Sequence, residues 1–291
     1  MRRLISLVLL LCVCVGVSSC DRAGEEHAVR LYFLDVGQGD CTLVRTPEGD
    51  VLIDAGTEQS EMRLCLRLRE IGVRSLRLAI FTHADEDHIG GADGVLSSFP
   101  TEEVWLNPNG QASDSLARLE ATIQRTGTVR KSADAGDLMR IGGVTAQVLL
   151  PFSAKDAQNG NEDSIVIRLL CGDVRILMTG DIGAEEEERM LSYYGRIQLD
   201  CDLYKVGHHG SNTSTSERFL QAADPAYAVI SCGAANSYGH PFGEVLTRLE
   251  KNGTQVLRTD LLGEIVFEIG SDGLTCLSES ALRMLRKGEE A

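Results

Sequence analysis

One stretch limits what this chain can fold into more than any other: an apolar strand that runs directly into a cluster of histidines and aspartates. The strand is predicted over 76–82, and the loop after it carries His83, Asp85, Asp87 and His88 before two glycines. Because side chains alternate along an extended chain, the first three of these point the same way. Packed without a cation they would repel one another and lose hydration, and a divalent ion removes that cost. The loop therefore predicts a metal site; a solvated acidic loop is the alternative.

Two further strand ends carry residues of the same kind. A buried strand predicted over 174–178 is followed by Asp181, which stands between two glycines and is free to reach inward and bridge two metals. A turn aspartate before an acidic helix is the alternative. A strand predicted over 202–206 is followed by a histidine pair, His208 and His209, flanked by glycines. Such a pair is unusual in a core and typical of a functional site.

These motifs together resemble a known family. The loop at 83–88 resembles the HxHxDH signature of the metallo-β-lactamase fold, with Asp85 in place of the second histidine. This variant and the stretches 33–40 (FLDVGQGD) and 205–211 (KVGHHGS) are similar to the carboxy-terminal hydrolase domain of ComEC-type DNA-uptake proteins, over about residues 29–270. The resemblance implies an α/β fold, the metallo-β-lactamase αββα sandwich, with two mixed β-sheets and helices on the outer faces.

The resemblance also implies a site for two divalent metal ions, zinc or manganese. One ion would take His83 and Asp85, the other would take Asp87, His88 and His209, and Asp181 would bridge the two. The expected catalytic residues are Asp87 and His208, and His208, which binds no metal, would protonate the leaving group. Substrate phosphate would contact Ser211, Thr213 and His240, and the site would be supported by Gln38, Asp40 and Asp54. Each of these last six is explained about as well by an ordinary structural role.

The aspartate at position 85 bears on the choice of metal. Three aspartates and three histidines, with no thiolate, form a harder ligand set than one in which Asp85 is histidine. Carboxylate oxygen suits Mn²⁺ and Mg²⁺, whereas imidazole and thiolate favour Zn²⁺, although raw affinity places Zn²⁺ above Mn²⁺. We therefore expect Mn²⁺ to support activity at least as well as Zn²⁺.

The ligand set predicts a metal-dependent hydrolase. We expect a phosphodiesterase or nuclease that acts on extracytoplasmic DNA or another phosphodiester, since two metals can generate hydroxide and clamp both oxygens of the displacement. Hydrolysis of an ester, lactone or β-lactam is one alternative, but lactamases and lactonases usually keep histidine where this chain has Asp85. An inactive DNA-binding or surface module is another, but such a module has no need of a full ligand set.

The amino terminus is expected to lie outside the fold. Arg2 and Arg3 precede an apolar run at 4–17 that is too short for a usual membrane span and has the form of a secretory signal peptide. It ends at Cys20 in a sequence that resembles a lipoprotein processing site, so we expect a lipid anchor and an extracytoplasmic location; plain secretion is the alternative. The predicted organisation is a leader at 1–20, a tether at 21–28, a hydrolase domain at 29–276 and a tail at 277–291.

Charge limits the choice of partner. The net charge of −15 disfavours strong non-specific DNA binding, which depends on Lys and Arg neutralising phosphates. The arginines at 63–77 are explained equally well as a solvated helix face. We expect a phosphodiester substrate, possibly DNA, contact with the membrane through the lipid, and no obligate protein partner.

The remaining pattern predicts strands and helices in alternation, which suits two sheets with helices outside. Ser214 and Glu217 form a capping box that would open a helix ending near Ala223 and leave N–H groups free for a phosphate. Glu185–Glu188 would form a solvated first helical turn. Strands are predicted at 29–36, 41–46, 51–54, 76–82, 103–106, 128–131, 144–150, 164–170, 174–178, 202–206, 227–231, 256–259 and 264–269, and the other helices at 61–71, 93–99, 113–126, 184–194 and 243–251.

Overall fold

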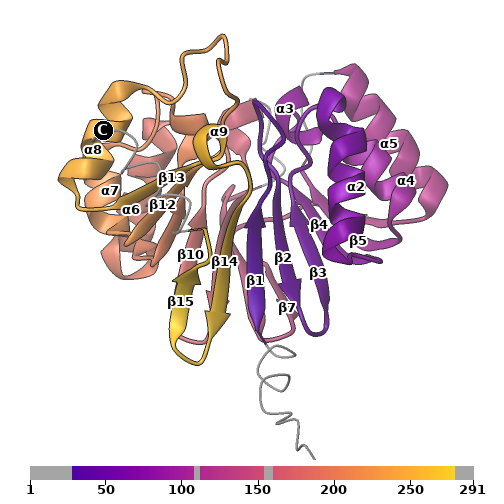
Figure 1. The fold of residues 1–291 in the computed structure, drawn as a ribbon, viewed down its shortest axis with the longest axis horizontal. Coiled ribbons are helices and arrows are strands. Elements are labelled where there is room, and N and C mark those ends of the chain that lie inside the picture. Colours follow the sequence, from indigo (N-terminus) through magenta and orange to yellow (C-terminus); the bar gives the residue numbers. More distant parts are fainter. Residues whose placement is uncertain (1–27, 108–111, 154–159, 279–291) are drawn as a thin grey trace, which may run out of the picture.

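Two packed β-sheets with helices on both outer faces make up the part of the chain that the computed structural model describes, residues 28–107, 112–153 and 160–278 (Figure 1). The predicted αββα sandwich is therefore confirmed. The predicted leader with Cys20, nearly all of the predicted tether and most of the predicted tail lie outside the described residues. Within the described ranges, no helix is long and apolar enough to span a membrane.

The first sheet contains β1 (Val29–Phe33), β2 (Thr42–Thr46), β3 (Gly49–Ile53), β4 (Leu76–Phe81), β5 (Thr101–Leu106), β6 (Val129–Lys131), β14 (Ile265–Gly270) and β15 (Gly273–Cys276). Its strand order is β15-β14-β1-β2-β3-β4-β5-β6. Strands β1 to β3 form an antiparallel meander, as predicted, and β3 to β6 run parallel. Because β14 pairs with β1, segments from both ends of the domain lie side by side in one sheet.

The second sheet contains β7 (Leu138–Ile141), β8 (Val144–Leu150), β9 (Val166–Cys171), β10 (Val174–Met178), β11 (Leu203–Lys205), β12 (Tyr227–Ile230) and β13 (Gln255–Arg258). Its order is β13-β12-β11-β10-β9-β8-β7. Strands β7 to β10 are antiparallel, and β10 to β13 are parallel. Each sheet thus has a parallel half, and the carboxyl ends of parallel strands meet at one edge of a sheet.

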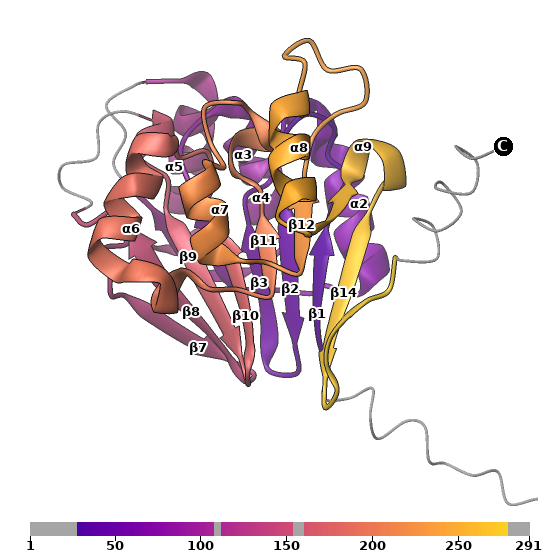
Figure 2. The same cartoon turned by 90° about the vertical axis from the view of Figure 1, so that its left-hand side faces the viewer.

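Three longer helices cover each sheet. The first is covered by α2 (Glu61–Ile71), α4 (Ala92–Ser98) and α5 (Asp114–Thr126), on the right in Figure 1, and the second by α6 (Ala184–Leu199), α7 (Glu217–Ala223) and α8 (Gly243–Lys251), in front in Figure 2. The short elements are α3 (Glu86–Ile89), α9 (Thr259–Leu262) and the 3₁₀ turns η1 (Glu58–Ser60), η3 (Gly160–Asp163) and η4 (Gly207–Gly210).

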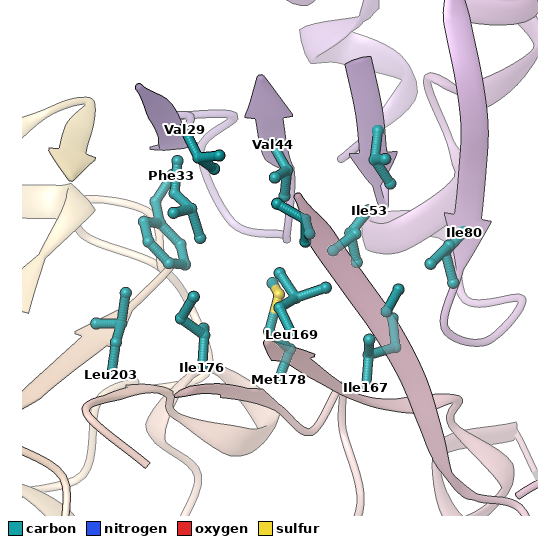
Figure 3. Close-up of a cluster of buried hydrophobic side chains, with 14 of the residues drawn as sticks. Val29, Phe33, Val44, Ile53, Ile80, Ile167, Leu169, Ile176, Met178 and Leu203 are labelled. Carbon is teal, nitrogen blue, oxygen red and sulfur yellow. The ribbon is translucent and has the colours of Figure 1, made fainter. Parts of the chain in front are cut away.

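The central core lies between the sheets. Figure 3 shows aliphatic and aromatic side chains of the first sheet, such as Phe33 and Ile80, facing Ile167, Ile176 and Met178 of the second. Phe33, Ile80 and Ile167 are fully buried, and burial of one such side chain contributes about 1.5–3 kcal/mol. This apolar layer fixes the two sheets against each other, and therefore fixes the relative positions of the loops at their shared edge.

Helix α2 has the bounds that the sequence predicts. Its buried face carries Leu64 and Leu68, one turn apart, and the left-handed Gly72, at φ 97°, ends it. Its arginines are largely paired: Arg67, for example, donates to both carboxylate oxygens of Glu264, each at 2.8 Å. This pairing fits a solvated helix face better than a phosphate-binding patch.

Two strands, β7 and β15, are missing from the sequence prediction. Strand β7 is a short edge strand with largely exposed side chains, and β15 is four residues long and begins with a glycine. Neither contains a run of apolar alternation, which is the main sequence signal for a strand. Both are held by pairing with a longer neighbour, β8 and β14 respectively.

Candidate metal centre

Loops from both sheets meet at one edge of the sandwich, beside α3 at the top centre of Figure 1. His83 follows β4, and His88 lies within α3. Asp181 follows β10, and His209 follows β11 within η4. The backbone N–H of Ile165 donates to the carbonyl of Thr82 at 2.8 Å, which ties the two sheets together at this point. Three loops that are far apart in sequence therefore share one site.

The imidazoles of His83, His88 and His209 are each oriented through the Nδ1 atom. His88 Nδ1 donates to Asp54 at 2.9 Å, and His209 Nδ1 donates to the carbonyl oxygen of Ser231 at 2.9 Å. His83 Nδ1 shares a hydrogen bond with the hydroxyl of Thr82 at 3.1 Å. All three Nε2 atoms are thus left to face the site. Partners of this kind, which fix the ring and tautomer of a ligand, are typical of metal-binding histidines.

The free nitrogens gather around Asp181. Its Oδ1 lies 3.4 Å from His88 Nε2, and its Oδ2 lies 3.4 Å from His209 Nε2. His209 Nε2 also lies 3.2 Å from Asp87 Oδ2. Ligand atoms of His83, His88 and Asp181 lie within 4.8 Å of one another, and so do those of Asp87, His88 and His209. The two oxygens of Asp181 therefore face different histidines, as a bridging carboxylate requires.

The buried polar atoms at this point fit metal ions. His83 Nε2, His88 Nε2, His209 Nε2 and Asp181 Oδ1 are buried, and none has a hydrogen-bond partner among the described residues. An unsatisfied buried polar group costs about 1–3 kcal/mol, and four of them at one point need a shared partner. Imidazole nitrogen and carboxylate oxygen both bind divalent cations of the zinc and manganese type. The donor set is the one that such cations require.

The electrostatics of the site also favour bound divalent cations. Burial alone would lower the pKa of His209, but Asp181 and Asp40 outweigh it and raise that pKa to about 10. Burial and the neighbouring His88 lower the pKa of His83 to about 3. Burial would raise the pKa of Asp181, but His209 and His88 hold it well below its usual range. The carboxylates thus attract positive charge into a buried site, which divalent cations can supply in place of protons.

Asp85 lies at the rim of the site and not among the tightest clusters. Its Oδ2 is 3.7 Å from His83 Nε2, and its side chain is 47 % exposed. Burial and the nearby Asp87 raise the pKa of Asp85. A carboxylate placed there can complete the coordination of an ion held by His83 without leaving the solvent-facing side.

The predicted substrate residues also gather here. His208 Nε2 lies 3.7 Å from Asp181 Oδ2, and its Nδ1 shares a hydrogen bond with the hydroxyl of Thr213 at 3.3 Å. That hydroxyl bonds in turn to the hydroxyl of Ser211 at 2.9 Å. The ring of His240 lies 5.7 Å from that of His208. His208 is 28 % exposed in its side chain and so can be reached from solvent.

The backbone at the site is unusual. Asp54, His208 and His209 have φ values of 59°, 48° and 53°. A residue with a Cβ in this left-handed region costs of order 1–3 kcal/mol, and such residues concentrate at functional sites. The conformation turns two consecutive histidines so that one enters the buried cluster and the other stays half-exposed.

The predicted supporting residues make defined contacts. Asp54 accepts from the N–H of Thr82 at 2.8 Å as well as from His88, and so holds the metal loop. Gln38 accepts from the N–H of Gly233 at 3.1 Å. Asp40 forms a buried ion pair with Lys205, whose Nζ is 2.7 Å from Asp40 Oδ2.

Four residues of the site are absent from the sequence prediction. Besides Thr82 and Ser231, these are Ser164, which lies 3.4 Å from His83 Nδ1 and accepts from the N–H of Asp181, and Lys205, whose side chain is 2 % exposed. Only Lys205 leaves a sequence signal, as a cation within an otherwise apolar strand next to the histidine pair. The others are ordinary hydroxyl residues whose role depends on the packing of distant loops.

The predicted phosphate site at the start of α7 is wrong. The N-cap is Ser216, not Ser214, whose hydroxyl donates to the carbonyl of Gly207 at 2.9 Å. The N–H groups of Thr215 and Ser216 both donate to the carboxylate of Glu187. Glu187 is fully buried, so it is not part of a solvated turn. The carboxylate of Glu187 therefore occupies the position that was expected to receive a phosphate.

Comparison with known proteins agrees with this arrangement. Residues 34–234 match the family described as the Metallo-beta-lactamase superfamily. The chain is 33 % identical over 253 residues to ComE operon protein 3 of Bacillus subtilis, covering 80 % of this chain and 32 % of that protein. It is 34 % identical over 259 residues to Competence protein ComA of Neisseria gonorrhoeae, covering 89 % of this chain and 35 % of that one. The chain thus spans about a third of the length of these relatives.

A solved structure gives the same fold. The metallo-beta-lactamase fold protein YhfI from Bacillus subtilis superposes with a TM-score of 0.54 at 12 % identity, covering 82 % of this chain and 99 % of that one. The predicted resemblance to the ComEC-type proteins is confirmed by the relatives, and the predicted fold by this neighbour. The chain belongs to the metallo-beta-lactamase superfamily.

Proposed function

We propose that this protein is a metal-dependent phosphodiesterase. The observation that carries the proposal is the placement of Asp181 between the unpartnered Nε2 atoms of His88 and His209, with the half-exposed His208 beside it. When bound, two divalent ions would supply an activated water and neutralise charge on a phosphodiester. The residues that would hold them are His83, Asp85, Asp87, His88, Asp181 and His209.

His208 is the proposed general acid. Its ring is held by Thr213 and stands at the solvent-facing side of Asp181, where a leaving oxygen would separate from phosphorus. It can give a proton to that oxygen without leaving its position. Ser211 and Thr213 offer hydroxyl donors on the same side, so they are proposed to hold a phosphate oxygen.

Replacing His208 with alanine is expected to leave metal content unchanged and to lower kcat by about 10²–10⁴, the usual contribution of a positioned general acid. The assay would compare bis-p-nitrophenyl phosphate, single- and double-stranded DNA, phosphorylcholine esters and nitrocefin. Hydrolysis of nitrocefin but of no phosphodiester would favour the ester and lactam alternative. No turnover of any substrate by the metal-loaded parent would leave the inactive binding module as the better account.

We also propose that manganese serves at least as well as zinc. Asp85 adds a carboxylate beside His83, where a histidine would make the ligands softer. Asp85→His is expected to raise the preference for Zn²⁺, measured both by competitive binding to chelator-stripped protein and by turnover with each metal. An unchanged ratio of Zn²⁺ to Mn²⁺ affinities in the variant would show that this position does not set the metal.

The proposed substrate is DNA, and the proposed location is outside the cytoplasm, at the membrane. One relative is named a competence protein and another a recombination protein, and these names favour DNA among phosphodiesters. The leader and Cys20 favour an extracytoplasmic protein held to the membrane by lipid. A short or single-stranded substrate suits the net charge of −15 better than a long duplex.

A further inference from the structure

An exposed aromatic side chain stands beside the metal centre. The loop at 233–242 follows β12 and carries Tyr238, which is 64 % exposed. Its ring lies 5.7 Å from that of His240 at an interplanar angle of 23°, a stacked arrangement. His240 lies in turn 6.2 Å from His209 at 29°. Tyr238 is therefore the outer member of a series of three stacked rings whose inner member is a proposed metal ligand.

The loop is built to hold this ring in place. The side-chain oxygen of Asn236 accepts from the N–H groups of Tyr238 at 3.1 Å and His240 at 3.0 Å. Its amide nitrogen donates to the carbonyls of Gly233 at 2.9 Å and His240 at 2.6 Å. At the base of the loop, a Cβ on Gly233 would lie only 2.7 Å from the backbone nitrogen of Gln38. The backbone of the loop thus packs tightly against the site and holds the residue that carries the exposed ring beside His240.

The outer face of Tyr238 is open. In the described part of the chain, guanidinium groups lie over the rings of Phe99 and Phe152, whereas no cation covers that of Tyr238. Tyr193, which is 71 % exposed, packs instead against the ring of Phe152, after β8, at 4.6 Å and against that of Tyr194, on α6, at 4.8 Å. Tyr238 is thus an aromatic surface whose only ring neighbour among the described residues leads toward the metal centre.

We infer that Tyr238 is a stacking site for the nucleobase next to the scissile phosphodiester. This inference rests on the proposed phosphodiesterase function and specifies its substrate as a nucleotide. Bases stack on aromatic side chains irrespective of sequence, and this contact needs no positive charge. Because the chain has a net charge of −15, cationic contacts to phosphates are not expected to dominate its affinity for a nucleic acid, and base stacking would add to the contacts made at the metal centre. A base stacked on Tyr238 would lie on the outer side of His240, next to a phosphate held at the metal centre.

The test must separate base stacking from mere support of His240. The substrates are dithymidine monophosphate and its abasic counterpart, which has the same phosphodiester but hydrogen in place of both bases. Tyr238→Ala is expected to lower kcat/KM for the first by about 10-fold or more and to leave the second unchanged, because only the first offers a ring to stack. Tyr238→Phe keeps the ring and should resemble the parent. Tyr193→Ala is the matched control and should change neither.

A second readout separates this inference from the proposed function. Isothermal titration would measure binding of a hydrolysis-resistant methylenephosphonate dithymidine to the same metal-loaded proteins. If the parent hydrolyses neither substrate, the proposed function fails, but weaker binding by Tyr238→Ala and not by Tyr238→Phe would still support a base-stacking site. Equal losses on both substrates, or equal binding by the parent and Tyr238→Ala, would overturn it.

Discussion

Replacing Asp181 with alanine is expected to abolish metal-dependent hydrolysis while the protein stays folded. The carboxylate faces His88 on one oxygen and His209 on the other, so its loss removes the group that is proposed to join the two ions. Metal ions supply several kcal/mol of charge stabilisation in such reactions, which corresponds to about 10³-fold or more in rate. The fold should survive because Asp181 lies after the end of β10 and its backbone N–H still donates to Ser164.

Turnover of bis-p-nitrophenyl phosphate would measure the loss of hydrolysis, and circular dichroism would check that the fold is retained. Asp173→Ala is the matched control, since Asp173 is an exposed residue at the other end of the same strand. It should keep the rate of the parent. An Asp181→Ala protein that keeps more than about a tenth of the parent's rate would be incompatible with a bridging role.

Replacing Lys205 with methionine is expected to destabilise the protein by about 3–5 kcal/mol, the usual effect of leaving one member of a buried ion pair without its partner. Lys205 and Asp40 are 2 % and 7 % exposed in their side chains, so solvent does little to screen the charge that remains. Burial would raise the pKa of Asp40, but Lys205 and His209 together hold it well below its usual range. Asp40 is therefore ionised in the folded protein and depends on Lys205.

Urea unfolding in the presence of a chelator would measure this effect without a contribution from bound metal. Asp40→Asn in the Lys205→Met background should restore most of the lost free energy of unfolding, because a neutral amide needs no counter-charge. Lys251→Met, on the exposed side of α8, should change stability by less than about 0.5 kcal/mol. A Lys205→Met protein as stable as the parent would show that the ion pair is not needed to keep Asp40 in place.

The sequence is most informative where a strand ends in a polar motif. The loops that carry His83, Asp181 and His209 each follow a strand that the sequence predicts, because apolar runs and glycines are local signals. The bounds of α2 and α8 are predicted for the same reason. The order of the strands within each sheet comes from tertiary pairing and has no such local signal.

What the sequence does not predict depends on residues far apart in the chain. Ser164 meets His83 across 81 positions, and Glu187 reaches the N–H of Ser216 across 29. The second of these reverses a prediction: an acidic first turn and a free helix start look like separate solvated features, yet they satisfy each other once packed. Lys205 is a similar case, since its partner Asp40 belongs to the other sheet's opening loop.

The metal content of the parent and of Asp181→Ala tests the central claim most directly. Chelator-stripped proteins would be loaded with Mn²⁺ or Zn²⁺, freed of excess by gel filtration and analysed by plasma mass spectrometry. If His83, His88, His209 and Asp181 form one site for two ions, the parent should retain two ions per chain and the variant should lose at least one. A parent that retains no metal, or a variant that retains as much as the parent, would contradict it.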